Sequence, residues 1–450
     1  MKKVAFHTLG CKVNAYETQS MQQQFISDGY EIVDFEDMAD VYIINTCSVT
    51  NIADRKSRQM LHRARQLNPT AIVIAAGCYV NAAKDQLVLD EMIDILIGND
   101  EKSHIIDVLN DYHAKKDSDD GSGHIVHTDV TDINQTRIFD ESPACDMHDY
   151  TRGFIKIEDG CNAFCSYCLI PYVRGRVRSR QTDSILKECE SLAGRGFREV
   201  VLTGIQLSGF GSDLGAPSDI AIPRLVDELS HIDGIERIRL GSLEPNIVTD
   251  SWVRAIASSG IVMPHFHLSL QSGSDTVLER MNRRYTSSEY EAAVDILREH
   301  FENPAITTDI IVGFPGESED EFLETVDFVE RISFFETHIF PYSMRSGTRA
   351  ARMDGQIEKR VKERRARILG EIHKRKSLAY RTLHIGGKVS VLAEKRIEID
   401  GKSYIDGHTK EYIHVAIPYD ENIQNKIIEG VLGEVIDGEI MGMEKVERVY

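Results

Sequence analysis

Residues 158–176 read EDGCNAFCSYCLIPYVRGR and carry three cysteines in the spacing C-x3-C-x2-C, namely Cys161, Cys165 and Cys168. The stretch 154–158 before them is a predicted strand, so the cysteines fall on the loop at its carboxyl end. A short loop with these spacings can turn three thiolates toward one point, and thiolates are the ligands that iron–sulfur clusters take. Three ligands leave one iron of a 4Fe-4S cluster free to bind another molecule. We therefore expect a cluster with an open coordination position.

A structural zinc site is the alternative for this loop. Such a site usually takes four protein ligands. No histidine or further cysteine lies within the twenty residues after Cys168, and Cys145 could serve only if its segment folded back. The spacing thus favours the iron–sulfur cluster.

Outward from this loop, the first hundred residues alternate short β-branched runs with helical patterns. The predicted strands are 4–9, 41–46, 71–76 and 93–97, and the predicted helices are 16–28, 53–67 and 83–92. Strands that alternate with helices in this way indicate a parallel, doubly wound sheet.

A second set of cysteines follows three of these strands directly: Cys11, Cys47 and Cys78. The carboxyl ends of parallel strands meet at one edge of a sheet, and ligands bind at that edge. Gly10 and Gly77 would permit tight turns beside a bulky group. We expect the three thiols to converge on a second metal centre, although three buried structural cysteines are the alternative.

The segment 115–145 is acidic and poor in apolar residues, which is typical of a linker. A second series of strand–helix units follows it, with strands predicted at 154–158, 199–203, 237–241, 265–270, 308–312 and 338–342. Six such units fit a partial or full β/α barrel, although open sheets use them too. We divide the chain into 1–114, 115–145, 146–379 and 380–448.

A basic helix is predicted at 357–383, and a different kind of sequence follows it. Between Arg345 and Arg381 there are 13 Lys or Arg against 4 Asp or Glu. Strands predicted at 388–394, 413–417 and 431–436 indicate a small all-β barrel. Tyr404, Tyr412 and Tyr419 could stack on nucleic-acid bases, with ordinary packing as the alternative.

Composition limits the remaining possibilities. The formal net charge of −20 argues against non-specific nucleic-acid binding through overall charge, but it is compatible with a local basic surface. The sequence shows no signal peptide and no run of about 18 apolar residues, so we expect a cytoplasmic protein without a membrane partner. In that compartment the eight cysteines are not expected to form disulfides. Cys189 shares the apolar face of a predicted helix, which favours core packing.

With both cysteine sets in place, nearly the whole chain resembles the methylthiotransferase family of radical S-adenosylmethionine (SAM) enzymes. The resemblance covers a three-cysteine amino-terminal domain, a radical SAM partial β/α barrel and a carboxy-terminal β-barrel like the TRAM domain. The stretches LGCKVNAYE (9–17) and CNAFCSYCLIPYVRGRVRSR (161–180) are most similar to the subgroup that modifies threonylcarbamoyladenosine at position 37 of tRNA. Related subgroups act on isopentenyladenosine in tRNA or on a ribosomal protein.

The resemblance implies two 4Fe-4S clusters and SAM as cofactors. The cluster on Cys161, Cys165 and Cys168 would reduce SAM to methionine and a 5′-deoxyadenosyl radical that removes hydrogen from C2 of the adenine. The cluster on the second cysteine set would carry or supply sulfur methylated by a second SAM. The implied partners are the tRNA anticodon stem-loop, a reductant such as flavodoxin or ferredoxin, and a sulfur donor.

The resemblance also suggests residues around SAM. Tyr167 occupies a place that commonly approaches the adenine of SAM, and the other candidates follow predicted barrel strands: Thr203, Gly204, Gln206, Ser242, Glu244 and Gln271. Functional groups in β/α barrels gather at the carboxyl ends of the strands. Polar and glycine-rich turns are also what strand-to-helix connections need, so each residue has an ordinary structural alternative.

Six arginines are candidates for substrate contacts: Arg174, Arg176, Arg178, Arg180, Arg345 and Arg349. The first four alternate along the chain, which predicts a common side of an extended segment suited to a phosphate or carboxylate. A solvated face is the alternative.

Two other functions remain open. One is the same chemistry on isopentenyladenosine or on a ribosomal protein, and the other is a non-enzymatic, metal-stabilised RNA-binding scaffold. Two cysteine sets that each leave a coordination position open favour catalysis over a scaffold.

Overall fold

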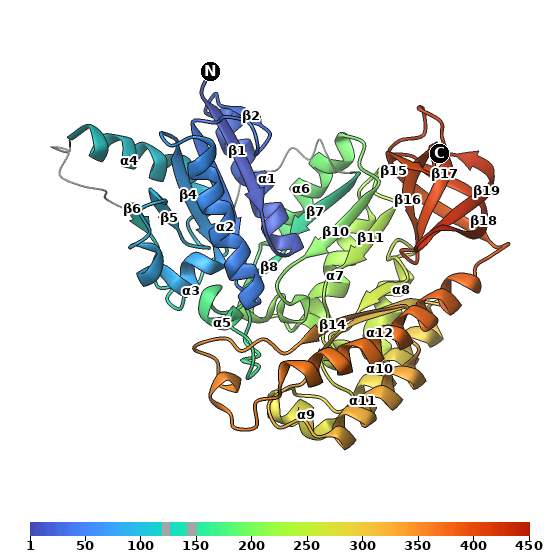
Figure 1. The fold of residues 1–450 in the computed structure, drawn as a ribbon. Coiled ribbons are helices and arrows are strands. Elements are labelled where there is room, and N and C mark those ends of the chain that lie inside the picture. The colour runs from blue at the N-terminus through green and yellow to red at the C-terminus, as the bar shows by residue number, and fades with distance from the viewer. Residues whose placement is uncertain (119–126, 142–150) are drawn as a thin grey trace.

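The computed structural model describes residues 1–118, 127–141 and 151–450, which form three units arranged along the chain (Figure 1). Cys145, the possible fourth zinc ligand, lies outside the described residues, as does part of the predicted linker 115–145. In the described part of the chain, no helix has the length and apolar character needed to cross a membrane.

The amino-terminal unit is a six-stranded parallel sheet in the order β2-β1-β3-β4-β5-β6. Its elements are β1 (Lys3–Thr8), α1 (Lys12–Ser27), β2 (Glu31–Val33), β3 (Val41–Thr46), α2 (Asn51–Leu67), β4 (Ile72–Gly77), α3 (Cys78–Leu87), β5 (Ile95–Ile97), α4 (Ile105–Ser118) and β6 (His127–Asp129). Helices α1 and α4 pack on one face, while α2 and α3 pack on the other. The predicted doubly wound sheet is confirmed.

The third helix differs from its prediction at 83–92, because α3 begins at Cys78 and ends at Leu87. Gly77 has φ +100°, and a Cβ there would lie 2.7 Å from Oδ1 of Asn45. The chain therefore turns directly from strand into helix at this glycine, which makes Cys78 the first helical residue. Strands β2 and β6 and helix α4 were not predicted.

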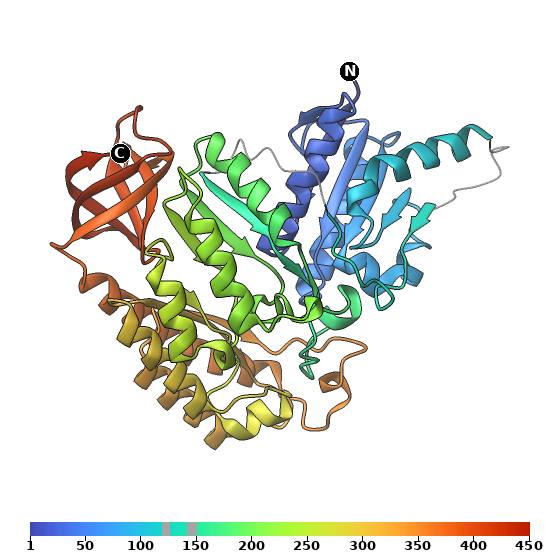
Figure 2. The same cartoon turned by 180° about the vertical axis from the view of Figure 1, so that it is seen from behind.

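The central unit contains six parallel strands in two sheets, β7-β10-β11 and β12-β13-β14, joined by isolated bridges beyond β11. The strands are β7 (Arg152–Lys156), β10 (Glu199–Thr203), β11 (Arg237–Leu240), β12 (His265–His267), β13 (Ala305–Val312) and β14 (Glu336–Pro341). The helices are α6 (Thr182–Gly194), α7 (Ser218–Ser230), α8 (Asp250–Ser258), α9 (Asp275–Arg280), α10 (Ser287–His300) and α11 (Glu319–Ile332), outside the curved sheet (Figure 2). The predicted partial β/α barrel is confirmed.

The two faces of these strands differ in chemistry. Side chains alternate along a strand, so one face carries Val200, Leu202 and Ile310, which are buried in the apolar core beneath the helices. The opposite face lines the barrel lumen and is polar. It includes Glu199 and Arg239, which form a buried ion pair at 2.6 Å.

The carboxy-terminal unit is a closed five-stranded barrel in the order β15-β16-β17-β19-β18, reached through the long helix α12 (Lys359–Thr382). Its strands are β15 (Lys388–Ile399), β16 (Lys402–Thr409), β17 (His414–Pro418), β18 (Ile427–Asp437) and β19 (Ile440–Val449). The predicted all-β barrel is confirmed, but β16 and β19 were missed. Both contain polar or charged residues at many positions, which hides the strand pattern.

Tyr412 docks this barrel onto the central unit. Its ring stacks on His265 with ring centroids 4.7 Å apart, and the guanidinium of Arg239 lies 4.8 Å from the ring centroid. Arg239 also donates hydrogen bonds to the backbone of Thr409 and Lys410. Tyr412 is thus engaged between two domains, which favours the packing alternative over base stacking for this residue. Tyr404 is half-buried and Tyr419 is exposed.

Candidate active site

The loop that carries the first cysteine set is fixed by short backbone contacts. Gly160 has φ +85°, and a Cβ there would lie 2.0 Å from the carbonyl oxygen of Arg176, so only glycine fits. The backbone N–H of Cys168 donates to the carbonyl of Cys165 at 3.0 Å, which closes the turn between these two cysteines.

The segment after α9 braces the same loop from the other side. The N–H of Ser166 donates to the carbonyl of Met281 at 2.9 Å. The side-chain amide of Asn282 donates to the carbonyls of Ala163 and Phe164 at 3.2 and 3.0 Å. The loop conformation is therefore set both locally and by a segment more than a hundred residues away.

A cavity of about 120 Å³ opens beside the three cysteines. Its lining includes all three of them together with four side chains expected around SAM and one that was not expected: Cys161, Cys165, Cys168, Tyr167, Gln206, Ser242, Glu244 and Arg283. The thiol of Cys161 donates to Oε1 of Gln206 at 2.8 Å. The structure thus brings residues from the ends of β10 and β11 and from the segment after α9 to the cysteine loop.

The other three expected residues do not line this cavity. Thr203 is buried at the end of β10, and Gly204 lies against Glu158, whose Oε2 would be 2.7 Å from an added Cβ. Gln271 has φ +71°, and its backbone N–H donates to the carbonyl of Asp309 at 2.8 Å. These residues shape the surrounding backbone, as expected from the alternative interpretation of polar turns.

Arg283 is the residue that sequence reasoning missed. Its Nη1 donates to Sγ of Cys165 at 3.2 Å, and its Nη2 lies 3.1 Å from the carboxylate of Glu244. In the sequence it is one of two adjacent arginines in MNRRY (281–285), and nothing there distinguishes it from Arg284. Only the fold shows that it is the one beside the thiols.

Burial disfavours the ionised form of the thiols in the first set. Burial raises the pKa of Cys168 to about 12 and also raises the pKa of Cys161 above its usual range. Free thiols here would stay protonated at neutral pH, so thiolates require a nearby positive charge, which iron would supply together with Arg283. The residues present therefore fit an iron–sulfur cluster.

Sulfur spacing argues against zinc. Sulfurs on one tetrahedral zinc ion lie roughly 3.8 Å apart, given Zn–S bonds of about 2.3 Å. Within the ranges that the structure describes, neither cysteine set brings three ligand atoms within 4.8 Å of one another. Neither set is therefore arranged as a tetrahedral zinc site in the described part of the chain.

The second cysteine set gathers at the predicted sheet edge. Cys11 precedes α1, Cys47 follows β3 and Cys78 begins α3. Gly10 has φ +107°, and a Cβ there would lie 3.0 Å from Sγ of Cys47. Burial raises the pKa of Cys47 to about 11, and the neighbouring thiols of Cys78 and Cys11 add to the shift. Cys11 is exposed, whereas the other two are buried.

Arg174 connects this edge with the first cysteine loop. It is completely buried, and its Nε lies 3.2 Å from Sγ of Cys78. Its Nη1 forms ion pairs with Glu17 at 2.8 Å and Asp159 at 3.0 Å. Burial opposes ionisation of Glu17, but the positive charges of Arg174 and two buried lysines hold the pKa of its carboxyl well below the usual range.

The prediction that four alternating arginines lie on one side of an extended segment is wrong. Arg174 follows the short helix α5 (Ile170–Val173) rather than lying in an extended segment. Arg178 is buried and donates to the carbonyl of Arg174 at 2.8 Å, while Arg180 is buried in ion pairs with Glu188 and Glu141. Arg176 alone of the four is exposed.

The other two candidate arginines, Arg345 and Arg349, differ from each other in burial. Arg345 is buried, and its Nη2 donates to Oγ of Ser48 at 2.8 Å and pairs with Asp54 at 2.7 Å, so it ties the central unit to the amino-terminal unit. Arg349 is exposed. Of the six candidates for substrate contacts, Arg176 and Arg349 therefore remain accessible.

The two regions that carry the cysteine sets both match known protein families. A profile for the radical SAM superfamily matches residues 155–329, and one for the uncharacterized protein family UPF0004 matches residues 3–98. The threonylcarbamoyladenosine tRNA methylthiotransferase MtaB of Bacillus subtilis is 37% identical over 95% of this chain and 93% of its own length. The chain belongs to the methylthiotransferase family of radical SAM enzymes. The MtaB protein of Aquifex aeolicus is 40% identical over 92% of this chain and 98% of its own.

A second group of relatives has a different printed substrate. The tRNA-2-methylthio-N(6)-dimethylallyladenosine synthase of Fusobacterium nucleatum is 35% identical over 88% of both chains. Among solved structures, the cobalamin- and [4Fe-4S]-bound radical SAM methyltransferase TsrM of Kitasatospora setae matches with a TM-score of 0.56 at 17% identity, covering 76% of this chain and 75% of its own. That likeness concerns the fold.

Proposed function

We propose that this chain attaches a methylthio group to C2 of N6-threonylcarbamoyladenosine at position 37 of tRNA. The observation that carries the proposal is the presence of two cysteine sets connected through Arg174, which follows the first set in the chain and contacts Cys78 of the second, in a chain 37–40% identical to MtaB proteins over nearly its whole length. A methylthiolation needs one centre that starts a radical and another that supplies sulfur, and two cysteine sets suit that division.

In this proposal Cys161, Cys165 and Cys168 hold one 4Fe-4S cluster, and Cys11, Cys47 and Cys78 hold the other. Bound together, the first cluster and SAM supply the radical that removes hydrogen from the adenine, chemistry that protein side chains alone do not perform. Gln206, Ser242 and Glu244 line the place for SAM beside the cysteine loop. Tyr167 contributes an aromatic face for the adenine of SAM.

The chain's own charges orient these groups. Arg283 neutralises thiolate charge at the first set, and its pair with Glu244 fixes the guanidinium in place. Arg174 does the same at Cys78. Both cations are buried, so water does not screen them and each retains a strong effect on the sulfur that it faces.

The proposed substrate is the anticodon stem-loop of tRNA. The basic helix α12 and the exposed Arg176 and Arg349 would contact the phosphates of this stem-loop, because their positive charges attract the RNA backbone. A low-potential reductant such as flavodoxin or ferredoxin and a sulfur donor complete the set of partners. We place the reaction in the cytoplasm, where tRNA is matured.

Methylthiolation of isopentenyladenosine is the second candidate, favoured by the 35% identity to the Fusobacterium nucleatum synthase. Both functions are tested by analysing tRNA nucleosides by mass spectrometry in a strain that lacks the gene. Loss of methylthio-threonylcarbamoyladenosine supports the proposal. Loss of only the methylthio derivative of isopentenyladenosine would replace it with the second candidate, and intact levels of both in a strain without a paralogue would overturn both.

A further inference from the structure

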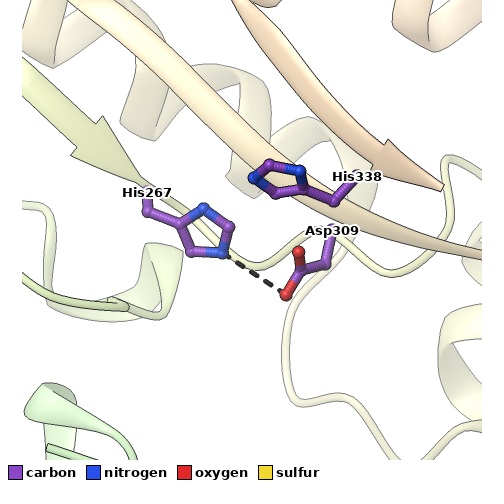
Figure 3. Close-up of side chains that lie close together, drawn as sticks. All are labelled: His267, Asp309 and His338. Carbon is purple, nitrogen blue, oxygen red and sulfur yellow. Dashed lines mark ion pairs between the residues drawn. The ribbon is translucent and has the colours of Figure 1, made fainter. Parts of the chain in front are cut away.

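Three metal-ligand side chains that belong to neither cysteine set meet in the barrel lumen. Figure 3 shows His267, Asp309 and His338 turned toward a common space from neighbouring strands. Their ligand atoms all lie within 4.8 Å of one another, and Nε2 of His267 is 3.4 Å from the carboxylate of Asp309. They are the one group of three or more His, Cys, Asp or Glu ligand atoms this close in the described ranges.

Strand register puts the three side chains on the same face. Asp309 on β13 pairs directly with His338 on β14, and Thr307, two residues before Asp309, pairs with His267 on β12. Residues two apart on a strand face the same side, and paired residues do so too. The neighbouring positions Ile306 and Ile310 belong to the apolar core under the helices, so the cluster faces the lumen.

A hydrogen bond fixes the orientation of His267. Its Nδ1 is 3.0 Å from Oγ1 of Thr307, which leaves Nε2 turned toward Asp309. Metal-bound histidines typically use one ring nitrogen for the metal and the other for a hydrogen bond that sets the ring's orientation. The side chains of His267 and Asp309 are 16% and 33% exposed, and His338 is exposed, so an ion can enter.

The separation of the ligand atoms distinguishes this cluster from an ordinary ion pair. A His–Asp pair alone needs two groups, as His300 and Asp250 show on the surface at 2.8 Å. The distance between His267 and Asp309 is longer, at 3.4 Å, and the imidazole of His338 lies close to both groups. Nitrogen and oxygen ligands on one tetrahedral zinc ion lie roughly 3.3–3.6 Å apart, given bonds of about 2.0–2.2 Å, so small side-chain adjustments complete the site.

We propose that His267, Asp309 and His338 form a site for a divalent transition-metal ion of the zinc class in the barrel lumen. Two imidazoles and one carboxylate are a ligand set that zinc takes while keeping a further position open. Ser269, which lines the cavity beside the first cysteine set, is two residues after His267 in an extended segment. The site thus lies about 7 Å along the strand from that cavity, in the same lumen.

The test uses the full-length protein with both clusters reconstituted under anaerobic conditions, so that the cysteines are occupied by iron. Zinc is added by equilibrium dialysis and measured beside iron by mass spectrometry, and X-ray absorption at the zinc edge identifies the ligands. We expect one zinc per chain with nitrogen and oxygen ligands at about 2.0–2.2 Å. Sulfur ligands at about 2.3 Å, or no retained zinc, would overturn the proposal.

Variants assign the site to its residues. Asp309→Asn and His338→Gln should each weaken zinc binding by at least about tenfold, because even loss of a ligand's hydrogen-bond partner can have that effect. His300→Gln, which removes a histidine from a surface pair with a carboxylate, is the matched control and should bind as the unaltered chain does. Equal zinc affinity in all four proteins would refute the assignment, and iron content with circular dichroism verifies that each variant is folded.

Discussion

Cys161, Cys165 and Cys168 lie within eight consecutive residues of one loop, whereas Cys11, Cys47 and Cys78 follow three different strands of a sheet. The first set is positioned by turns and by a bracing segment, so its geometry depends on few residues. The second set exists only when β1, β3 and β4 pair in register. Spacing in the sequence therefore reveals the first set directly, while the second is visible only through a prediction of topology.

The two sets also differ in their charged neighbours. Arg283 faces the first set from within the central unit, whereas Arg174 faces Cys78 from a different unit of the chain. The second set consequently depends on domain docking in a way that the first does not.

The largest expected effect comes from removing one cysteine of each set. Cys161→Ala should abolish both SAM cleavage and product formation, because no cluster can form beside the SAM cavity. Cys78→Ala should abolish the methylthio product but leave reductive SAM cleavage. In both variants iron should fall from about eight to about four per chain. Loss of SAM cleavage in Cys78→Ala, with four irons retained, would show that the sets do not have separate roles.

Arg174→Gln should produce the next largest effect. Glu17 and Asp159 keep their lysine partners, but they lose buried hydrogen bonds from Arg174, and Oδ1 of Asn14 loses the hydrogen bond that Arg174 donates, which typically costs about 1–3 kcal/mol. We expect a lower free energy of unfolding in anaerobic denaturation and selective loss of iron from the second cysteine set. Arg176→Gln is the control, since an exposed arginine should change stability by less than about 0.5 kcal/mol. Similar losses in the two variants would contradict the role of the buried network.

Two glycines allow the sets to be disturbed separately. Gly160→Ala brings a methyl group against a backbone carbonyl 2.0 Å away, and Gly10→Ala brings one to 2.9 Å from Cβ of Cys47. Each also places alanine at positive φ, at a cost of about 1–2 kcal/mol before any clash. We expect Gly160→Ala to impair SAM cleavage and Gly10→Ala to reduce only the methylthio product. Gly29→Ala, at φ +85° with open space around it, controls for backbone strain.

The smallest effect concerns pH and the segment that braces the first loop. Hydrogen bonds from Arg280 are the largest cause of a pKa of about 2 for Glu321, against an ordinary value of 4.5. Because the folded pKa is lowered, this stabilisation is complete above pH 4.5 and is lost as pH falls toward 2.

The Ser166 amide is bonded to the segment after Arg280, so we expect its hydrogen exchange to become faster between pH 5.5 and 3.5 than intrinsic rates explain. Because solvent screens this partly exposed pair, the expected change in local opening is only about 1 kcal/mol, less than the full pKa shift would give. Glu321→Gln should remove this pH dependence. An unchanged pH dependence in that variant would assign the effect to another group.

Features that depend on residues close together in the sequence were predicted accurately. The cysteine loop, the six barrel strands and the convergence of three strand ends follow from spacing, β-branched runs and the rule for parallel sheets. Arg174 shows the limit, because its partner Glu17 is 157 residues away and burial cannot be read from an alternating pattern of arginines. Arg283 shows another, since two adjacent arginines look alike until the fold places one of them beside a thiol.

The predictions of some helix and strand boundaries were wrong for local physical reasons. The helix predicted at 83–92 begins at Cys78 instead, because the chain turns from strand into helix at Gly77. In β16 and β19 the barrel's outer residues are polar, so their strand pattern is weak. These errors leave the architecture intact, because closure of the barrel depends on pairing rather than on the apolar content of each strand.

The stacked rings of His265 and Tyr412 affect how molecules can pass through the barrel lumen. Together with the buried pair of Glu199 and Arg239, they fill the amino-terminal end of the central strands, where the carboxy-terminal barrel docks. This end of the lumen is therefore closed by side chains, so a molecule that reaches the cysteine loop does not pass through it.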